Sequence, residues 1–125
     1  MAEGYSETVL DHVERPRNRG VIENPDGAGI ERNPVCGDLL TLTLRVADGC
    51  IAEARQEVKG CTGSVAASSI LTDMLTGATL EAAAAITSQA IVTALDGLPP
   101  HRLHSAALAT SALRKALAFY RAKQR

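Results

Sequence analysis

Hydrophobic and polar residues alternate along residues 40–58, which is the period of a β-strand. From Leu40 to Val46 every second side chain is aliphatic, and the residues between them are polar. The stretch from Ile51 to Val58 continues with charged residues on its solvent side, and the intervening Asp48-Gly49 tolerates the positive φ of a tight turn. We therefore predict an antiparallel hairpin whose apolar face is covered by helices, since two strands alone are rarely stable.

The segment before the hairpin contains one predicted helix and one irregular stretch. Tyr5, Val9 and Val13 recur every four residues, which predicts a helix over about residues 6–14. A proline and a glycine shortly afterwards end this helix. Residues 21–31 are interrupted by one proline and two glycines, so we predict a loop that includes at most a short edge strand.

The segment after the hairpin has a helical period. We predict one helix from Cys61 to a stop at Gly77, a short helix capped by Thr79, another capped by Thr87 or Ser88, and a last helix after Pro99-Pro100. The order of a helix, a small antiparallel sheet and several helices predicts an α+β fold with helices on one sheet face. With 125 residues the chain has the size of a single domain, 1–125.

Composition narrows the range of functions. Hydrophobic residues make up 46% of the chain but aromatic residues only 2%, so the core must consist mainly of alanine, leucine, isoleucine and valine. The formal net charge is -1 and neither sign forms a run, which argues against nucleic acid as a partner. We find no signal or transit pattern and no apolar stretch near the ~18 residues of a membrane span, so we expect a cytoplasmic protein with no membrane partner.

The three cysteines indicate where chemistry could take place. An odd number without dense pairing favours reduced thiols or metal ligands over a disulfide framework. Cys36 lies just before the predicted hairpin and Cys61 just after it, so closing the hairpin brings both to its open end. Cys50 lies beside the turn, roughly 30 Å away at about 3.3 Å per residue, and is expected to be a small apolar filler.

Two further residues converge on the open end of the hairpin. Asp38 follows Cys36 by two residues, so its carboxylate can face the same point, and His104 falls in the first turn of the last predicted helix. Cys61 opens a helix whose free N–H groups and dipole stabilise an anion such as a thiolate. Each residue alone is commonly structural, so the convergence is what predicts a site. Thiolate, carboxylate and imidazole together are ligands for zinc or iron.

Four short motifs stand along the chain: Asp11-His12 with Pro16-Arg17-Asn18 and Gly20, then Asn33-Pro34 with Cys36-Gly37-Asp38, then Gly60-Cys61, then Leu98-Pro99-Pro100. Their order and spacing resemble the IscU/NifU-type iron–sulfur scaffold family. The resemblance implies the IscU/SufU/NifU N-terminal-like fold and a scaffold rather than an enzyme. By this resemblance a [2Fe–2S] cluster is assembled with sulfur from a cysteine desulfurase and passed to apo-proteins, with Cys36, Asp38, Cys61 and His104 as cluster or zinc ligands.

Two segments depart from the family pattern. The family reads His-Cys where this chain reads His104-Ser105, and the family cysteine is a ligand and a leading candidate for receiving persulfide sulfur. A serine hydroxyl is hard, weakly acidic and unable to form a persulfide. The segment Leu98–Arg102 resembles the family's binding segment for a DnaK-type chaperone, but His101 and Arg102 differ from it.

These observations leave three hypotheses. The protein is a divergent scaffold that holds a [2Fe–2S] cluster or a metal ion through the four residues, or a cluster-free accessory or regulatory protein that binds zinc and docks on a cysteine desulfurase complex. A thiol enzyme with Cys61 as nucleophile and His104 as base is the third, although no oxyanion or substrate element supports it. The first two hypotheses differ in whether a site with serine at position 105 still holds a cluster.

Overall fold

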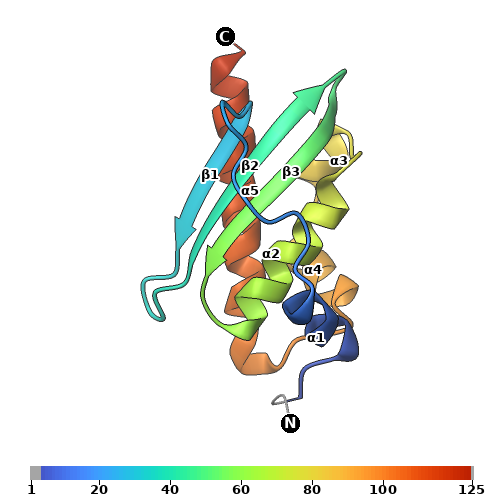
Figure 1. Cartoon of the computed structure of the whole chain (residues 1–125), viewed down its shortest axis with the longest axis vertical. Helices are drawn as coiled ribbons and strands as arrows, with labels where there is room; N and C mark the ends of the chain where they lie inside the picture. The colour runs from blue at the N-terminus through green and yellow to red at the C-terminus, as the bar shows by residue number, and fades with distance from the viewer. Residues whose placement is uncertain (1–3, 125) are drawn as a thin grey trace.

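The computed structural model describes residues 4–124 and has the predicted α+β architecture, with a three-stranded antiparallel sheet ordered β1-β2-β3 (Figure 1). The strands are β1 (Gly27–Arg32), β2 (Leu39–Ala47) and β3 (Cys50–Lys59). The helices are α1 (Glu7–Glu14), α2 (Thr62–Leu75), α3 (Leu80–Ala84), α4 (Ser88–Ala94), the 3-10 turn η1 (Pro100–Arg102) and α5 (His104–Lys123). Helix α5 packs against β1 and β2, and α2 packs against β3, so both lie on one sheet face.

The β2–β3 hairpin forms as the alternating pattern predicts. Leu39 pairs with Lys59 at its open end and Ala47 pairs with Cys50 at its turn, where Asp48 and Gly49 both have positive φ. The alternation breaks at one point that the sequence did not reveal. Arg45 pairs with Glu53 but Val46 pairs with Ile51, so Ala52 is an extra, unpaired residue, which is the arrangement of a β-bulge. The bulge lets Ile51 and Ala54 both face the core.

The helix boundaries follow the capping residues in the sequence. Ser6, Thr79 and Thr87 each accept a hydrogen bond from the backbone N–H three residues later, which satisfies a donor that the helix leaves free. Helix α2 begins directly after Cys61 and ends before Gly77, and α5 begins at His104, as predicted. Residues near each helix end therefore determine where these helices begin and end.

The segment between α1 and β1 is more ordered than the sequence suggested. It crosses in front of β3 and β2 in Figure 1, on the sheet face opposite α5. The backbone of Gln56 in β3 exchanges hydrogen bonds with Asn18 and Gly20, and the Ile22 N–H donates to the hydroxyl of Thr43 at 3.0 Å. Thr43 is consequently buried, although strict alternation predicted that its side chain would face solvent.

Strand β1 is also longer than predicted, with all six residues paired to β2. Its glycines explain why the sequence pattern is weak. A Cβ atom at Gly29 would lie 2.2 Å from the Ala112 carbonyl oxygen, so only glycine lets α5 approach the strand this closely. The residue that suggests a loop is thus the one that allows the helix to pack on the sheet.

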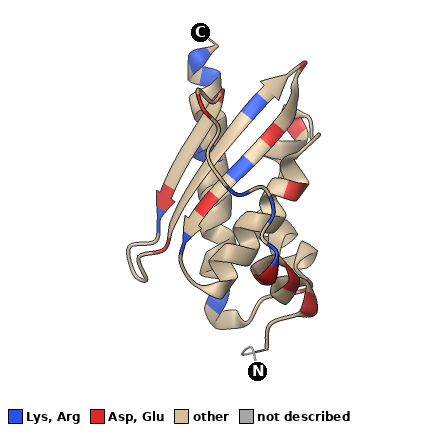
Figure 2. Ribbon diagram, viewed as in Figure 1, with Lys and Arg blue, Asp and Glu red and all other residues tan. Residues whose placement is uncertain are grey.

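The core is aliphatic, as the composition predicts. Its buried residues are leucine, isoleucine, valine and alanine from the sheet and from α1 to α5. Val13 of α1, and Tyr5 just before that helix, pack at the margin of the core. Figure 2 shows acidic and basic positions interspersed along the ribbon. Glu53 and Arg55 on β3, for example, form an ion pair at 2.7 Å. No helix among the described residues is long and apolar enough to cross a membrane.

Candidate metal centre

The loop between β1 and β2 positions two of the predicted ligands. The Asn33 N–H donates to the Asp38 carbonyl at 2.8 Å, the Gly37 N–H donates to the Asn33 carbonyl at 2.7 Å, and the Asn33 side chain accepts from the Val35 N–H at 2.9 Å. These bonds close the loop on itself. As a result Cys36 is exposed at its tip, whereas Asp38, at its return to β2, is only 4% exposed.

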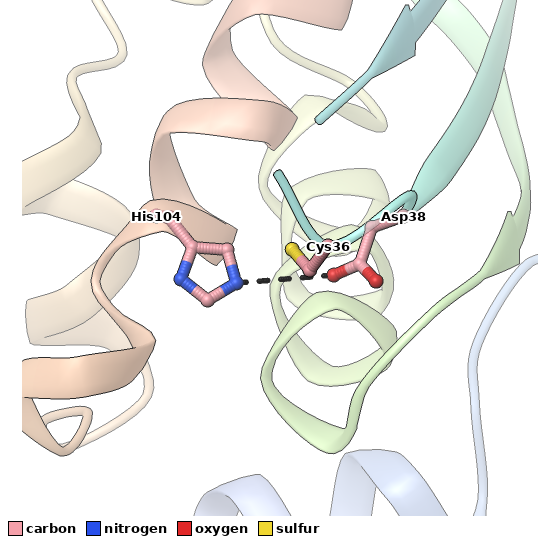
Figure 3. Close-up of side chains that lie close together, drawn as sticks. All are labelled: Cys36, Asp38 and His104. Atoms are coloured by element: carbon pink, nitrogen blue, oxygen red, sulfur yellow. Dashed lines mark ion pairs between the residues drawn. The ribbon is translucent and has the colours of Figure 1, made fainter. Parts of the chain in front are cut away.

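Cys36, Asp38 and His104 come together from two elements that are far apart in sequence. One ligand atom from each residue lies within 4.8 Å of the others. Figure 3 shows the three side chains pointing toward one another, His104 from the first turn of α5 and the other two from the loop before β2. A hollow of about 190 Å³ opens beside His104 and is lined by residues of that loop and of α5. The group is therefore accessible from outside.

The imidazole of His104 has an unused nitrogen at this point. Its Nε2 is buried, finds no hydrogen-bond partner among the described residues, and lies 3.9 Å from Oδ2 of Asp38. A buried polar atom without a partner is unusual in folded proteins. A lone pair on Nε2 facing a thiol and a carboxylate is the arrangement that a metal ion would complete.

Cys61 adjoins this group through Asp38. It is the N-cap residue of α2, and its thiol donates to Oδ2 of Asp38 at 3.4 Å. The same sulfur lies 3.6 Å from the Ser64 hydroxyl and 3.5 Å from the Ser105 hydroxyl. The structure thus brings all four predicted residues to one end of the hairpin, with Asp38 between Cys61 and His104.

The surroundings of Asp38 favour its carboxylate form. Burial by itself raises the pKa of this carboxyl, but hydrogen bonds from the Ser64 hydroxyl, the Cys61 thiol and the Cys61 backbone N–H lower it, as does attraction to His104. The net effect is a pKa below the ordinary value of 3.8. Asp38 is therefore an anion at neutral pH although it is buried.

Two glycines make room for these side chains. A Cβ atom at Gly60 would lie 2.6 Å from Cγ of Asp38, and one at Gly63 would lie 2.7 Å from the hydroxyl oxygen of Ser105. Both distances are shorter than any real Cβ contact, so a larger residue at either position would displace the polar group opposite. The motif Gly60-Cys61-Thr62-Gly63 therefore supplies a thiol and also lets Asp38 and Ser105 approach the backbone closely.

Ser105, the position where the family has cysteine, is fully buried beneath the group. Its hydroxyl contacts the sulfur of Cys61 and lies 3.2 Å from the hydroxyl of Ser64. The prediction that His104 and Ser105 lie in the first turn of α5 is confirmed. Ser64 was not singled out from the sequence, because a serine three residues after a cysteine carries no signal until the fold places it against Asp38.

The remaining cysteine lies at the opposite end of the hairpin. Cys50 pairs with Ala47 beside the turn, as the hairpin geometry predicted. It also forms a backbone bridge to Thr79, which was not predicted. The hypothesis of a thiol enzyme receives no support among the described residues. The thiol of Cys61 bonds to Asp38, Ser64 and Ser105, whereas His104 approaches Asp38, so the predicted nucleophile and base do not form a hydrogen bond with each other among the described residues.

Comparison with known proteins identifies the family to which the chain is similar. The sequence model of the NifU-like N-terminal domain matches residues 4–125. An IscU iron–sulfur cluster assembly scaffold protein of Archaeoglobus fulgidus is 45% identical over 116 residues, which cover 93% of this chain and 76% of the relative. The corresponding Escherichia coli K12 protein is 40% identical over 124 residues, which cover 96% of each chain.

Solved structures show the same fold. A SufU-type iron–sulfur cluster assembly scaffold from Fervidobacterium islandicum, 25% identical, matches with a TM-score of 0.73 over 90% of this chain and 96% of that chain. A NifU-like N-terminal domain from Brucella abortus, 20% identical, matches with a TM-score of 0.70 over 97% of this chain and 96% of that chain. At 20% identity the second likeness supports the fold alone.

Proposed function

The chain belongs to the NifU-like N-terminal domain family of iron–sulfur cluster assembly scaffolds, and on this premise we propose that Cys36, Asp38, Cys61 and His104 hold a [2Fe–2S] cluster or a metal ion. The observation that carries the proposal is the meeting of three ligand atoms within 4.8 Å, beside a buried His104 nitrogen that has no other partner. In this role the cluster is cargo that the protein later transfers to apo-protein acceptors.

The chemistry of the four residues suits this cargo. Thiolates bind iron and zinc strongly, and an imidazole is a good ligand for both ions. A carboxylate supplies the fourth position, and mixed thiolate and histidine ligation of a [2Fe–2S] centre is known chemistry. The anionic form of Asp38 attracts a cation, and the helix N-terminus at Cys61 stabilises a thiolate, which is the form of cysteine that binds metal.

The buried serine at position 105 determines how firmly a cluster is held. Its hydroxyl lies behind the sulfur of Cys61 and is enclosed by Gly63 and Ser64. A hard, mostly protonated oxygen is a weak ligand for iron in a cluster and cannot carry persulfide sulfur. We expect a cluster that is bound weakly and released easily, with sulfur delivered by a cysteine desulfurase to Cys36 or Cys61.

The partners in this proposal are a cysteine desulfurase and apo-protein acceptors. Recruitment of a DnaK-type chaperone through Leu98–Arg102 is a further expectation. Part of that segment forms the short turn η1 directly before α5, with Pro100 and His101 exposed. A chaperone bound there would contact the chain next to His104.

Serine at position 105 also favours a second candidate function. A protein that holds only zinc, through two thiolates, an imidazole and a carboxylate, would need no third cysteine. Such a protein would dock on a cysteine desulfurase complex as an accessory or regulatory subunit. The two functions share one site and differ in its cargo.

Anaerobic reconstitution separates the two functions. The reduced full-length protein is incubated with iron, sulfide and thiol, and visible absorption and metal analysis report the product, while elemental analysis of the untreated protein reports zinc. A [2Fe–2S] spectrum that is lost when Cys61 is replaced by alanine supports the scaffold. Zinc at up to one ion per chain with no cluster after reconstitution supports the accessory protein. Absence of both products would contradict the site.

A further inference from the structure

Ser64 contacts the candidate metal centre but was not predicted to belong to it. It lies in the first turn of α2, is 0% exposed, and its hydroxyl donates to Oδ2 of Asp38 at 2.6 Å. The same oxygen atom is the one that the Cys61 thiol approaches at 3.4 Å and the His104 nitrogen at 3.9 Å. One atom of Asp38 is thus shared by three neighbours, and Ser64 makes the shortest contact.

The single proton of the Ser64 hydroxyl has two acceptors within reach. A carboxylate can only accept, and Oδ2 of Asp38 lies 2.6 Å from the Ser64 oxygen. The Ser64 hydroxyl is also placed to donate to the hydroxyl oxygen of Ser105, at 3.2 Å. Because the carboxylate is both nearer and charged, the hydrogen bond to Asp38 is the stronger of the two.

We propose that Ser64 is a positioning residue of the metal centre, whose hydroxyl holds Oδ2 of Asp38 turned toward His104 and Cys61. The inference rests on the proposed function, because it assigns a role toward the metal ion that the site would hold. Ser64 itself is not a ligand in this proposal, since its oxygen is buried behind Asp38 and its proton is already engaged. It acts only through Asp38.

The same helix contains a matched control. Ser68 lies one turn further along α2, is 1% exposed, and its hydroxyl finds no partner among the described residues. Serine and alanine are close in volume, and alanine favours a helix more, so both Ser64→Ala and Ser68→Ala should preserve the fold. The two variants remove the same group from similarly buried places on one helix. Only the first removes a hydrogen bond to Asp38.

The test measures zinc affinity of the reduced full-length protein by competition with a chromophoric chelator. Removal of an outer hydrogen-bond partner of a ligand typically weakens metal binding about 10–100-fold, so we expect a loss of that size for Ser64→Ala and none for Ser68→Ala. The visible spectrum of bound Co²⁺ should change in Ser64→Ala, because the carboxylate is less well oriented. Thermal unfolding of the metal-free variants checks that both are folded.

A double-mutant cycle with Asp38→Ala shows whether Ser64 acts through Asp38. In the Asp38→Ala background, Ser64→Ala should cause no further loss of zinc affinity. An equal loss in both backgrounds, an equal loss for Ser68→Ala, or unchanged affinity in Ser64→Ala would overturn the inference and leave the proposed function intact. A wild-type protein that binds neither zinc nor Co²⁺ would instead overturn the proposed function, and the inference with it.

Discussion

The two ends of the β2–β3 hairpin each carry a cysteine, and they are organised in opposite ways. At the turn end, near Cys50, the polar groups that meet are backbone groups. The N–H of Gly77 donates to the Ile51 carbonyl at 2.7 Å, and that of Leu80 donates to the Gly49 carbonyl at 3.1 Å. At the open end, near Cys61, side chains meet instead, with Asp38 accepting from both a thiol and a hydroxyl.

This difference explains why only one end is suited to bind a metal ion. Backbone groups that bond to one another are satisfied and rigid, and the thiol of Cys50 makes no hydrogen bond among the described residues. At the open end a carboxylate oxygen of Asp38, the sulfur of Cys36 and a nitrogen of His104 lie within 4.8 Å of one another, and Nε2 of His104 has no hydrogen-bond partner among the described residues. The thiol of Cys61 adjoins this group through its contact with Asp38. Burial of a cysteine therefore predicts little about its function, whereas the nature of its neighbours predicts much.

The largest expected effect comes from removing the cysteine at the open end, with the cysteine at the turn end as its control. Cys61→Ala should abolish binding of zinc and of a reconstituted cluster, because it removes one of two thiolates from the centre. Cys50→Ala should bind both as the wild type does. Metal analysis and visible absorption after anaerobic reconstitution measure these outcomes. Loss of metal in Cys50→Ala, with retention in Cys61→Ala, would show that the assignment of the two ends is wrong.

A glycine at each end allows a second comparison. In Gly60→Ala the new methyl group would lie 2.6 Å from Cγ of Asp38, so the side chain of Asp38 must move. We expect zinc affinity to fall by at least tenfold and the free energy of unfolding to fall by about 1–3 kcal/mol.

Gly49→Ala, at the turn, is the control for this variant. It meets no atom within 4 Å but has φ of +74°, so it should cost about 1–2 kcal/mol of stability and leave zinc affinity unchanged. Chemical denaturation and chelator competition measure the two quantities. Equal zinc affinities in both glycine variants would contradict the role assigned to close packing at Asp38.

Adding a third thiol at the open end of the hairpin should strengthen the binding of a cluster there. Ser105→Cys introduces a third soft ligand beside Cys61 and a group that can accept persulfide sulfur, so the yield or lifetime of the reconstituted [2Fe–2S] cluster should rise several-fold. Decay of visible absorption measures the lifetime. Mass spectrometry after mixing with a cysteine desulfurase measures added sulfur. If both proteins behaved alike, Ser105 would be functionally neutral and an ordinary scaffold role would be the better interpretation.

The smallest effect is expected at a histidine away from both ends. His12 in α1 is buried with its Nδ1 at 2.6 Å from the Ser69 hydroxyl. Burial lowers the pKa of His12 below its ordinary value of 6.5, and nearby Arg17 lowers it further, against the opposing effect of Asp73 and Asp11. The unfolded chain therefore binds a proton at higher pH than the folded protein does.

The consequence is a stability that falls as the pH falls below 6.5, toward the lowered pKa of the folded state. The slope from one group is at most about 1.4 kcal/mol per pH unit. Urea unfolding between pH 7.5 and about pH 5 measures it, and His12→Gln should reduce the slope. The same substitution should leave zinc affinity at pH 7.5 unchanged. An undiminished slope in His12→Gln would assign the pH dependence to other groups.

Local sequence signals were sufficient for most of the fold. Thr79 and Thr87 cap the helices they were expected to cap, Ser6 caps the helix that was predicted to start there, and the alternating residues from Leu40 onward form the central strand. These features depend on contacts within a few residues, so they can be predicted from sequence. The full length of β1 could not be predicted, because its glycines are compatible with a strand only when α5 packs against them.

The sequence alone also placed three of the four candidate ligands at one end of the hairpin. The hairpin begins after Cys36 and Asp38 and ends before Cys61, and Leu39 pairs with Lys59 at that end. His104 comes from α5 and meets Cys36 and Asp38 only because that helix packs on the sheet. The tertiary structure also decided the layer behind these residues, where Ser64 donates to Asp38 and Ser105 contacts Cys61. The contacts of Ser105 join the first turns of α2 and α5, more than forty residues apart in the chain. Such contacts depend on how closely two helices pack, which no local pattern of residues encodes.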